Sequence, residues 1–336
     1  MGTKKKADIL HITEPAGVMN ETAVLLSFMG HTKIIPLVRS IFTDAERVFS
    51  GKYSGYRSIP GGYNDFAHTA EVFLASVRLL HGLHAAARKD ASNVIKKAAK
   101  DLIKGLPGAR TIDEAVFHDH KPLSERGVIV TLAAALFHDI DFIQKENARA
   151  SEEKERRGIT FVKRYCRQKR MSPAETKACV QMIESLAAES LASMKFSSAL
   201  ASSGAKVLVT ADLMAQLADR RYLEKLLSLY HDMRKTGLVI YGSADEILSQ
   251  TEHFYNDIAR RRMNEELGGL HRVMRGHFSV RWGADRDFYE EYMNKNITYL
   301  RRIVQKYGRN YGEHLRRSDE ISDSKAKPKS KKKKKR

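Results

Sequence analysis

The sequence predicts an all-α fold, and three observations support this prediction. Apolar residues recur at helical spacing along most of the 336-residue chain. No stretch alternates apolar and polar residues for long enough to form a half-buried strand. Clusters of proline and glycine divide the chain into segments of helical length. Hydrophobic residues make up 42% of the sequence, which is enough to build a sizeable core.

The N-terminal part contains two predicted helical regions. The apolar residues of segment 25–41 predict the first, which ends near the glycine-rich loop at Gly51. After the break at Pro60-Gly61-Gly62, two apolar stripes predict a helix that is buried on two sides and carries His68 on one of them. Residues 90–124 are polar and broken by glycine and proline, so we expect an excursion between two core helices.

The apolar run Val128–Phe137 predicts a central helix, whose C-terminal end carries His138 and Asp139. Further helices are expected at about 151–169, 172–192 and 204–235, and a helical pattern continues over about 244–312. The run Val128–Phe137 has ten residues, about half of the roughly 20 that a transmembrane helix needs. We therefore expect no membrane span.

Charge is concentrated at the C-terminus. The chain has a net charge of +19, and Lys325–Arg336 holds nine basic residues and no acidic one. Such a segment cannot pack, so we expect a disordered lysine-rich tail over 316–336. The tail either solubilises the protein or makes weak contacts with nucleic acid, ribosomes or an anionic surface. Before it we expect three parts: an N-terminal helical lead-in (1–50), a core (51–235, with an insertion at about 90–124) and a C-terminal helical region (236–315).

The sequence favours a cytoplasmic protein. Its N-terminus starts with lysines but has no continuous apolar segment after them, which argues against a secretory signal. Cys166 and Cys179 are the only cysteines, too few for a disulfide framework and without the spacing of a metal-binding pair. We expect both to be reduced and structural.

His138 and Asp139 form the strongest candidate site. A carboxylate at the end of a buried helix is costly unless its charge is compensated, and a divalent cation can provide that compensation. The negative end of the helix dipole also favours a cation there. Because a metal ion needs three or four nitrogen or oxygen ligands, His68 and Asp212, each on another apolar helix, are the candidate partners. The alternative for His68 is a core histidine bonded to a backbone carbonyl.

The His-Asp dipeptide occurs three times, so the pair alone is not specific. His118-Asp119 lies in the polar excursion and has no apolar helix before it. His231-Asp232 follows an apolar helix, but its only downstream carboxylate candidate, Asp245, is more simply a first-turn helix residue favoured by the dipole. Only His138-Asp139 has a histidine on a buried helix before it and an aspartate inside an apolar helix after it.

These residues resemble the HD-domain metal-dependent phosphohydrolases, in particular the branch related to cyclic nucleotide phosphodiesterases. The segments that carry the resemblance are "GKYSGYRSIPGGYNDFAHTAEV", "LAAALFHDIDFI" and "TADLMAQLADRRYLEKL", which together cover about 50–235. The resemblance implies a helical bundle and an enzyme that cleaves a phosphoester, of a nucleotide or cyclic nucleotide, with a metal-activated water.

The same resemblance implies the roles of individual residues. His68, His138, Asp139 and Asp212 would be the metal ligands, and Asp139 would bridge two divalent ions, of Mg, Mn, Fe or Zn. Two arginines, Arg220 and Arg221, follow Asp212 by about two helical turns and are candidates for contact with a substrate phosphate.

The sequence departs from the family pattern at one catalytic position. Asn64 stands four residues before His68, where the phosphodiesterases have a histidine that protonates the leaving oxygen. Asparagine can orient a water or a phosphate oxygen, but it cannot donate a catalytic proton. The acidic residue expected three positions after His68 is present as Glu71, and Asp141 stands where a glycine is common.

Two alternatives to the hydrolase remain open. Because Asn64 lacks a catalytic proton, the chain can instead be a weakened HD-domain module that binds or senses a nucleotide. A protein without any active site, which binds nucleic acid through its basic tail, is the second alternative. A bound metal would distinguish the hydrolase and the HD-domain module from the nucleic-acid-binding protein. Turnover of a substrate would distinguish the hydrolase from the module.

Overall fold

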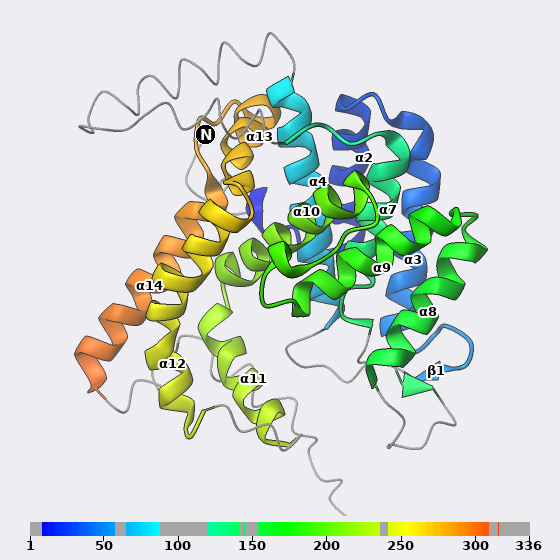
Figure 1. The fold of residues 1–336 in the computed structure, drawn as a ribbon. Helices are drawn as coiled ribbons and strands as arrows, with labels where there is room; N and C mark the ends of the chain where they lie inside the picture. The colour runs from blue at the N-terminus through cyan, green and yellow to red at the C-terminus, as the bar shows by residue number, and fades with distance from the viewer. Residues whose placement is uncertain are drawn as a thin grey trace, which may run out of the picture.

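The computed structural model describes residues 9–57, 65–87, 120–140, 144–145, 154–235, 241–308 and 315. These residues form an almost entirely helical protein (Figure 1), which confirms the predicted all-α class. The two strands among them have two residues each: β1 (Tyr56–Arg57) pairs antiparallel with β2 (Gln144–Lys145), with Tyr56 opposite Lys145. None of the helices in these ranges is long and apolar enough to cross a membrane. The predicted tail lies outside the described residues.

The α-helices alternate with short 3-10 and π-helical segments. The first half contains α2 (Pro15–Phe28), the 3-10 turn η1 (Thr32–Ile34), α3 (Ile35–Phe49), α4 (Phe66–Ala87), α7 (Glu125–Leu136), α8 (Lys154–Gln168) and α9 (Pro173–Ala187). The second half contains η3 (Leu191–Ser193), α10 (Ala199–Ala218), α11 (Tyr222–Lys235), α12 (Ala244–His253), the π-helical segments η4 (Phe254–Ala259) and η5 (Arg262–Glu266), η6 (Leu270–Arg272), α13 (Val273–Trp282) and α14 (Phe288–Tyr307).

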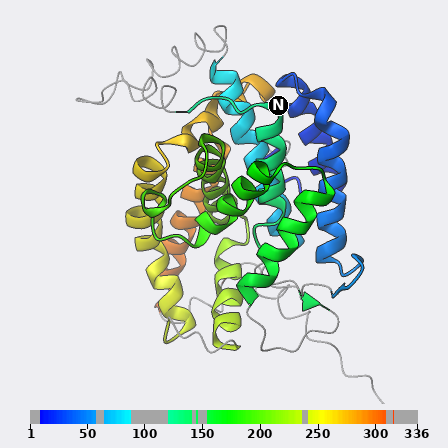
Figure 2. The ribbon, with the colours of Figure 1, turned by 45° about the vertical axis from the view of Figure 1, so that its right-hand side comes forward.

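Helices α4, α7 and α10 form the centre of the molecule. Helix α4 packs on both α7 and α10, and α10 also contacts α7 and α9. As Figures 1 and 2 show, α2 and α3 cover one side of this centre and α13 and α14 cover another, while α8 lies outside α9. All three central helices are buried nearly all round, which agrees with the two apolar stripes expected around His68.

Two predicted helical regions are each divided in two. The first breaks after α2, where Gly30 takes a φ of 80°, a left-handed conformation that glycine adopts without strain. The predicted helix over 204–235 breaks after Ala218, because Asp219 leaves the helical conformation and its carboxylate accepts a hydrogen bond from the Arg221 N–H. The same helix begins earlier than predicted, at Ala199, because Ser198 caps it through the Ala201 N–H.

Short polar residues also fix the ends of other helices. The Ser124 hydroxyl accepts the Gly127 N–H at the start of α7. Ser172 and Glu175 form a reciprocal capping box at the start of α9. Cys166 of α8 and Cys179 of α9 are free cysteines that are buried in the core.

A buried arginine joins the N-terminal segment to the last helix. Arg78 of α4 is 0% exposed, and its guanidinium donates to the backbone carbonyls of Ile9 and Leu10 and to the Tyr289 hydroxyl. The ring faces of Phe278 and Tyr289 lie 5.7 Å from its guanidinium carbon. One side chain therefore holds three separate parts of the chain together.

A buried pair of imidazoles joins α4 to α13. The Nδ1 atoms of His81 and His277 are 3.1 Å apart, so one ring donates a hydrogen bond to the other. Burial, and then the charges of His84 and Arg281, lower the pKa of His81 to about 4. Burial lowers the pKa of His277 as well, with Arg78, His81 and Arg281 acting in the same direction. Both rings are therefore neutral at neutral pH.

This pair makes the free energy of unfolding depend on pH. Because His81 has a lower pKa in the folded protein than its ordinary 6.5, unfolding takes up a proton between pH 6.5 and about 4. The contribution of the neutral His81 ring to stability is fully present above pH 6.5 and decreases as the pH falls through this window. We expect His81→Gln to remove about 3 kcal/mol of the acid-induced loss of stability, measured by urea unfolding at a series of pH values. His253→Gln, at an exposed histidine, is the control, and an equal change in both variants would contradict this assignment.

Candidate metal centre

The fold brings four predicted ligand residues together from three helices. His68 lies in the first turn of α4, His138 and Asp139 lie in the turn that follows α7, and Asp212 lies in the middle of α10. The Asp65 carboxylate accepts the backbone N–H of His68 at 2.9 Å and so fixes the start of α4. Contacts between α4, α7 and α10 in the core then set the relative positions of the four side chains.

The ligand atoms are spaced as around a metal ion. His68 Nε2 lies 3.2 Å from Asp212 Oδ1 and 3.9 Å from Asp139 Oδ2. His138 Nε2 lies 3.2 Å from Asp139 Oδ2 and 3.8 Å from Asp212 Oδ1. Two atoms bound to one ion at about 2.1 Å can be at most about 4.2 Å apart. All four distances are below this limit.

The orientation of His138 leaves one ring nitrogen for a ligand. Its Nδ1 is 2.9 Å from the Ala135 carbonyl, so the neutral ring donates its proton there and carries a lone pair on Nε2. Among the described residues, the buried atoms His138 Nε2 and Asp139 Oδ2 have no partner with hydrogen-bond geometry, although they lie 3.2 Å apart. Buried polar atoms without partners are costly, and a bound cation would satisfy both.

The electrostatics of the pair agree with a site for positive charge. Burial alone would lower the pKa of His138, but the Asp139 and Asp212 carboxylates outweigh it and raise this pKa to about 9. Burial opposes ionisation of Asp139, yet the two nearby histidines hold its pKa below the ordinary value. The carboxylates therefore attract a cation, either a proton on the imidazole or a metal ion.

Three further charged residues lie next to the candidate ligands. Glu71 is one turn from His68 on α4, Asp219 follows α10, and Lys225 reaches both from α11. The Lys225 ammonium contacts the Asp219 carboxylate and lies 3.7 Å from Glu71 Oε2. Burial, and then the charge of Asp219, raise the pKa of Glu71 to about 7. Asp219 and Lys225 were not predicted from the sequence. The one available signal was the seven-residue spacing of Asp212 and Asp219, which is about two helical turns.

The other predicted residues have different outcomes. Arg220 and Arg221 lie in the turn between α10 and α11, so the expected helical spacing from Asp212 does not exist, because α10 ends at Ala218. Asn64, Asp141 and the pair His118-Asp119 lie outside the described residues. Asp245 lies in the first turn of α12, as predicted.

Within the described ranges, His68, His138 and Asp212 form the one group of three or more metal-binding side chains whose ligand atoms all lie within 4.8 Å of one another. Asp139 adds a fourth ligand atom within 4 Å of both histidines. Comparison of the chain with protein-family models, curated proteins and solved structures gives no significant match.

Proposed function

We propose that the protein is a metal-dependent phosphohydrolase that cleaves a phosphoester of a nucleotide or cyclic nucleotide. The observation that carries this proposal is the convergence of the ligand atoms of His68, His138, Asp139 and Asp212. Within the described part of the chain, His138 Nε2 and Asp139 Oδ2 are buried without a hydrogen-bond partner. The order of these residues in the sequence resembles that in the HD-domain phosphohydrolases, and this resemblance suggests phosphoester hydrolysis as the reaction.

The donor set fits the proposed cofactor. Two imidazole nitrogens and two carboxylates suit divalent zinc, iron or manganese, and the carboxylates also suit magnesium. Bound divalent ions supply Lewis acidity, which stabilises charge on a phosphoryl oxygen and eases the ionisation of water. His68, His138, Asp139 and Asp212 would hold these ions.

The protein's own residues orient the ligands and can exchange a proton. The Ala135 carbonyl fixes the His138 ring, and Asp65 fixes the first turn of α4, which carries His68. Glu71, with a pKa of about 7, is half protonated near neutral pH and lies close to His68. It can give or take a proton there, which Asn64 cannot.

A metal-replacement experiment tests the function directly. The purified protein is stripped with a chelator, reloaded separately with zinc, manganese, iron or magnesium, and assayed with an activated aryl phosphodiester and with nucleoside 3′,5′-cyclic phosphates. We expect hydrolysis only after reloading with at least one metal. Equal rates in stripped and reloaded protein would overturn the proposal.

Because position 64 is asparagine and not histidine, we can predict which substrates react well. An activated aryl leaving group departs without a proton, whereas the ribose oxygen of a cyclic nucleotide needs one. We therefore expect the wild-type protein to cleave the aryl substrate readily and the cyclic one poorly. Asn64→His should raise kcat/KM for the cyclic nucleotide by about 10²–10⁴-fold and leave the aryl substrate nearly unchanged.

The same measurements decide between enzyme and binding module. A wild type that is already efficient on the cyclic nucleotide would show that another group, such as Glu71, donates the proton. Metal-dependent nucleotide binding without turnover of any substrate, in the wild type and in Asn64→His, would favour the regulatory module instead.

A further inference from the structure

Helix α8 presents a strongly basic surface. Its inner face is buried and includes Phe161, Val162, Tyr165 and Cys166. Its outer face is exposed and carries Lys163, Arg164, Arg167, Gln168 and, just beyond the helix, Arg170. Between residues 158 and 170 the chain has five basic residues and no acidic one. We call the exposed side chains of Lys163, Arg164, Arg167 and Arg170 the α8 basic face.

Among the residues that the structure describes, few carboxylates lie near this charge. Among the described residues, no carboxylate lies within 4.0 Å of Lys163, Arg167 or Arg170, whereas Lys169, at the edge of this face, pairs with Asp44 at 2.7 Å. Some other surface arginines do pair with a carboxylate, for example in the two-point contacts Arg126–Glu175 and Arg275–Asp285. The α8 basic face therefore keeps a positive potential that could attract an anionic partner.

The end of α3 and the segment that leads to β1 lie beside this surface. Arg47, in the last turn of α3, and Lys52 are exposed, and the guanidinium of Arg47 lies 5.9 Å from the centre of the Tyr53 ring. The Tyr53 hydroxyl donates to Gln168 Oε1 at 3.4 Å, which places the segment beside α8. Arg164 in turn donates to the Tyr56 hydroxyl at 2.6 Å. Arg47 and Arg164, from two parts of the chain, thus lie against the neighbouring rings of Tyr53 and Tyr56.

We infer that the α8 basic face, together with Arg47 and Lys52, binds nucleic acid through its phosphates. Side chains one helical turn apart, such as Lys163 and Arg167, are about 5–6 Å apart and can contact successive phosphates of one strand. Arginine is well suited to phosphate because its guanidinium can donate two parallel hydrogen bonds. The proposal is independent of the proposed hydrolase activity.

The chemistry of the surface favours nucleic acid over a lipid membrane. A helix that lies in a membrane interface inserts its apolar face between the lipids, but the apolar face of α8 is buried in the core. The large apolar side chains that are exposed in the described ranges are Val24, Phe28, Ile258, Val280 and Val304, and none belongs to α8. The lysine-rich segment 325–336 has the same sign of charge and would strengthen binding to the same kind of partner.

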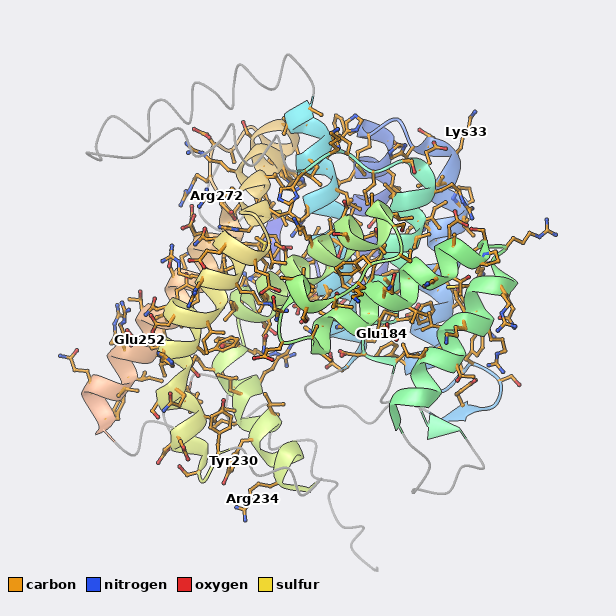
Figure 3. The ribbon with its side chains drawn as sticks, in the orientation of Figure 1. Lys33, Glu184, Tyr230, Arg234, Glu252 and Arg272 are labelled. Carbon is orange, nitrogen blue, oxygen red and sulfur yellow. The ribbon has the colours of Figure 1, made fainter. Side chains whose placement is uncertain are left out.

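A charge-matched pair of triple variants of the full chain tests this inference. The test variant carries Lys163→Gln, Arg167→Gln and Arg170→Asn, where asparagine suits the positive φ of 56° at this position. The control carries Lys295→Gln, Arg302→Gln and Lys306→Gln on α14, which lies far from α8 (Figures 1 and 3). Glu252, labelled in Figure 3, marks this region through its ion pair with Arg301. Both variants lower the net charge by the same amount.

Binding of fluorescein-labelled single-stranded RNA and duplex DNA is measured by anisotropy over a range of KCl concentrations. We expect the α8 variant to bind at least about tenfold more weakly at low salt, and its log–log salt slope to fall by roughly 2, because two to three phosphate contacts are lost. The α14 variant should stay within about twofold of the wild type.

Two results would overturn the inference. Equal losses in the two variants would mean that only net charge matters. Unchanged RNA and DNA binding by the α8 variant, with weaker binding to vesicles of anionic lipid, would assign the surface to a membrane. Circular dichroism of both variants checks that these exposed substitutions leave the helices intact.

Discussion

Asp139→Ala is expected to lose bound metal and hydrolytic activity together. The substitution removes one of the two carboxylates that face the His138 and His68 imidazoles at 3.2 and 3.9 Å. Loss of a supporting partner alone lowers metal affinity or activity by about 10–100-fold, so loss of a ligand should exceed about 100-fold. The measurements are metal content after dialysis and kcat/KM for the aryl phosphodiester.

Asp119→Ala is the matched control, because Asp119 belongs to another His-Asp dipeptide and lies in the predicted polar excursion. It should keep its metal and its activity. If the purified Asp139→Ala protein kept full metal content and activity, the assignment of this residue would be wrong. Asp139→Asn, which preserves the shape of the side chain, separates loss of charge from loss of packing, and it should also lose metal.

Arg78→Met is expected to destabilise the fold more than any surface substitution. Methionine can fill the space of the arginine stem, but it leaves the carbonyls of Ile9 and Leu10 and the Tyr289 hydroxyl without their donor. A buried acceptor that loses its donor costs about 1–3 kcal/mol, and this substitution leaves three such acceptors. Urea unfolding followed by circular dichroism measures this change in the free energy of unfolding.

Arg302→Met on α14 provides the control, because Arg302 is exposed and should change the free energy of unfolding by less than about 0.5 kcal/mol. A similar small effect of Arg78→Met would mean that other donors replace the guanidinium. In that case the segment around Leu10 would not depend on this contact.

The helical class could be predicted from the sequence, and so could three polar side chains whose ligand atoms lie close together in the structure. His68, His138 and Asp212 were found because each is a polar residue in or beside a long apolar helix, where an unsatisfied group is costly. The breaks at Gly30 and Asp219 were missed because the apolar pattern continues on both sides of them. A local turn can interrupt a helix without a change in periodicity.

Partners that come from distant parts of the chain could not be predicted. Arg78 and His81 look like ordinary helix residues in the sequence, and their partners, Tyr289 and His277, belong to helices near the C-terminus. Lys225 likewise shows no signal for its contacts with Glu71 and Asp219. Such pairs depend on how helices pack, which single-sequence periodicity does not specify.

The four candidate ligands come from α4, from the turn after α7 and from α10, which are distant in sequence, so the complete site exists only in the folded chain. Any ligand that binds there therefore adds its binding free energy to the stability of the fold by mass action. Above the dissociation constant, each tenfold rise in free ligand adds about 1.4 kcal/mol to the free energy of unfolding. The lifetime of this protein against heat and proteolysis would then depend on the composition of its surroundings as well as on its sequence.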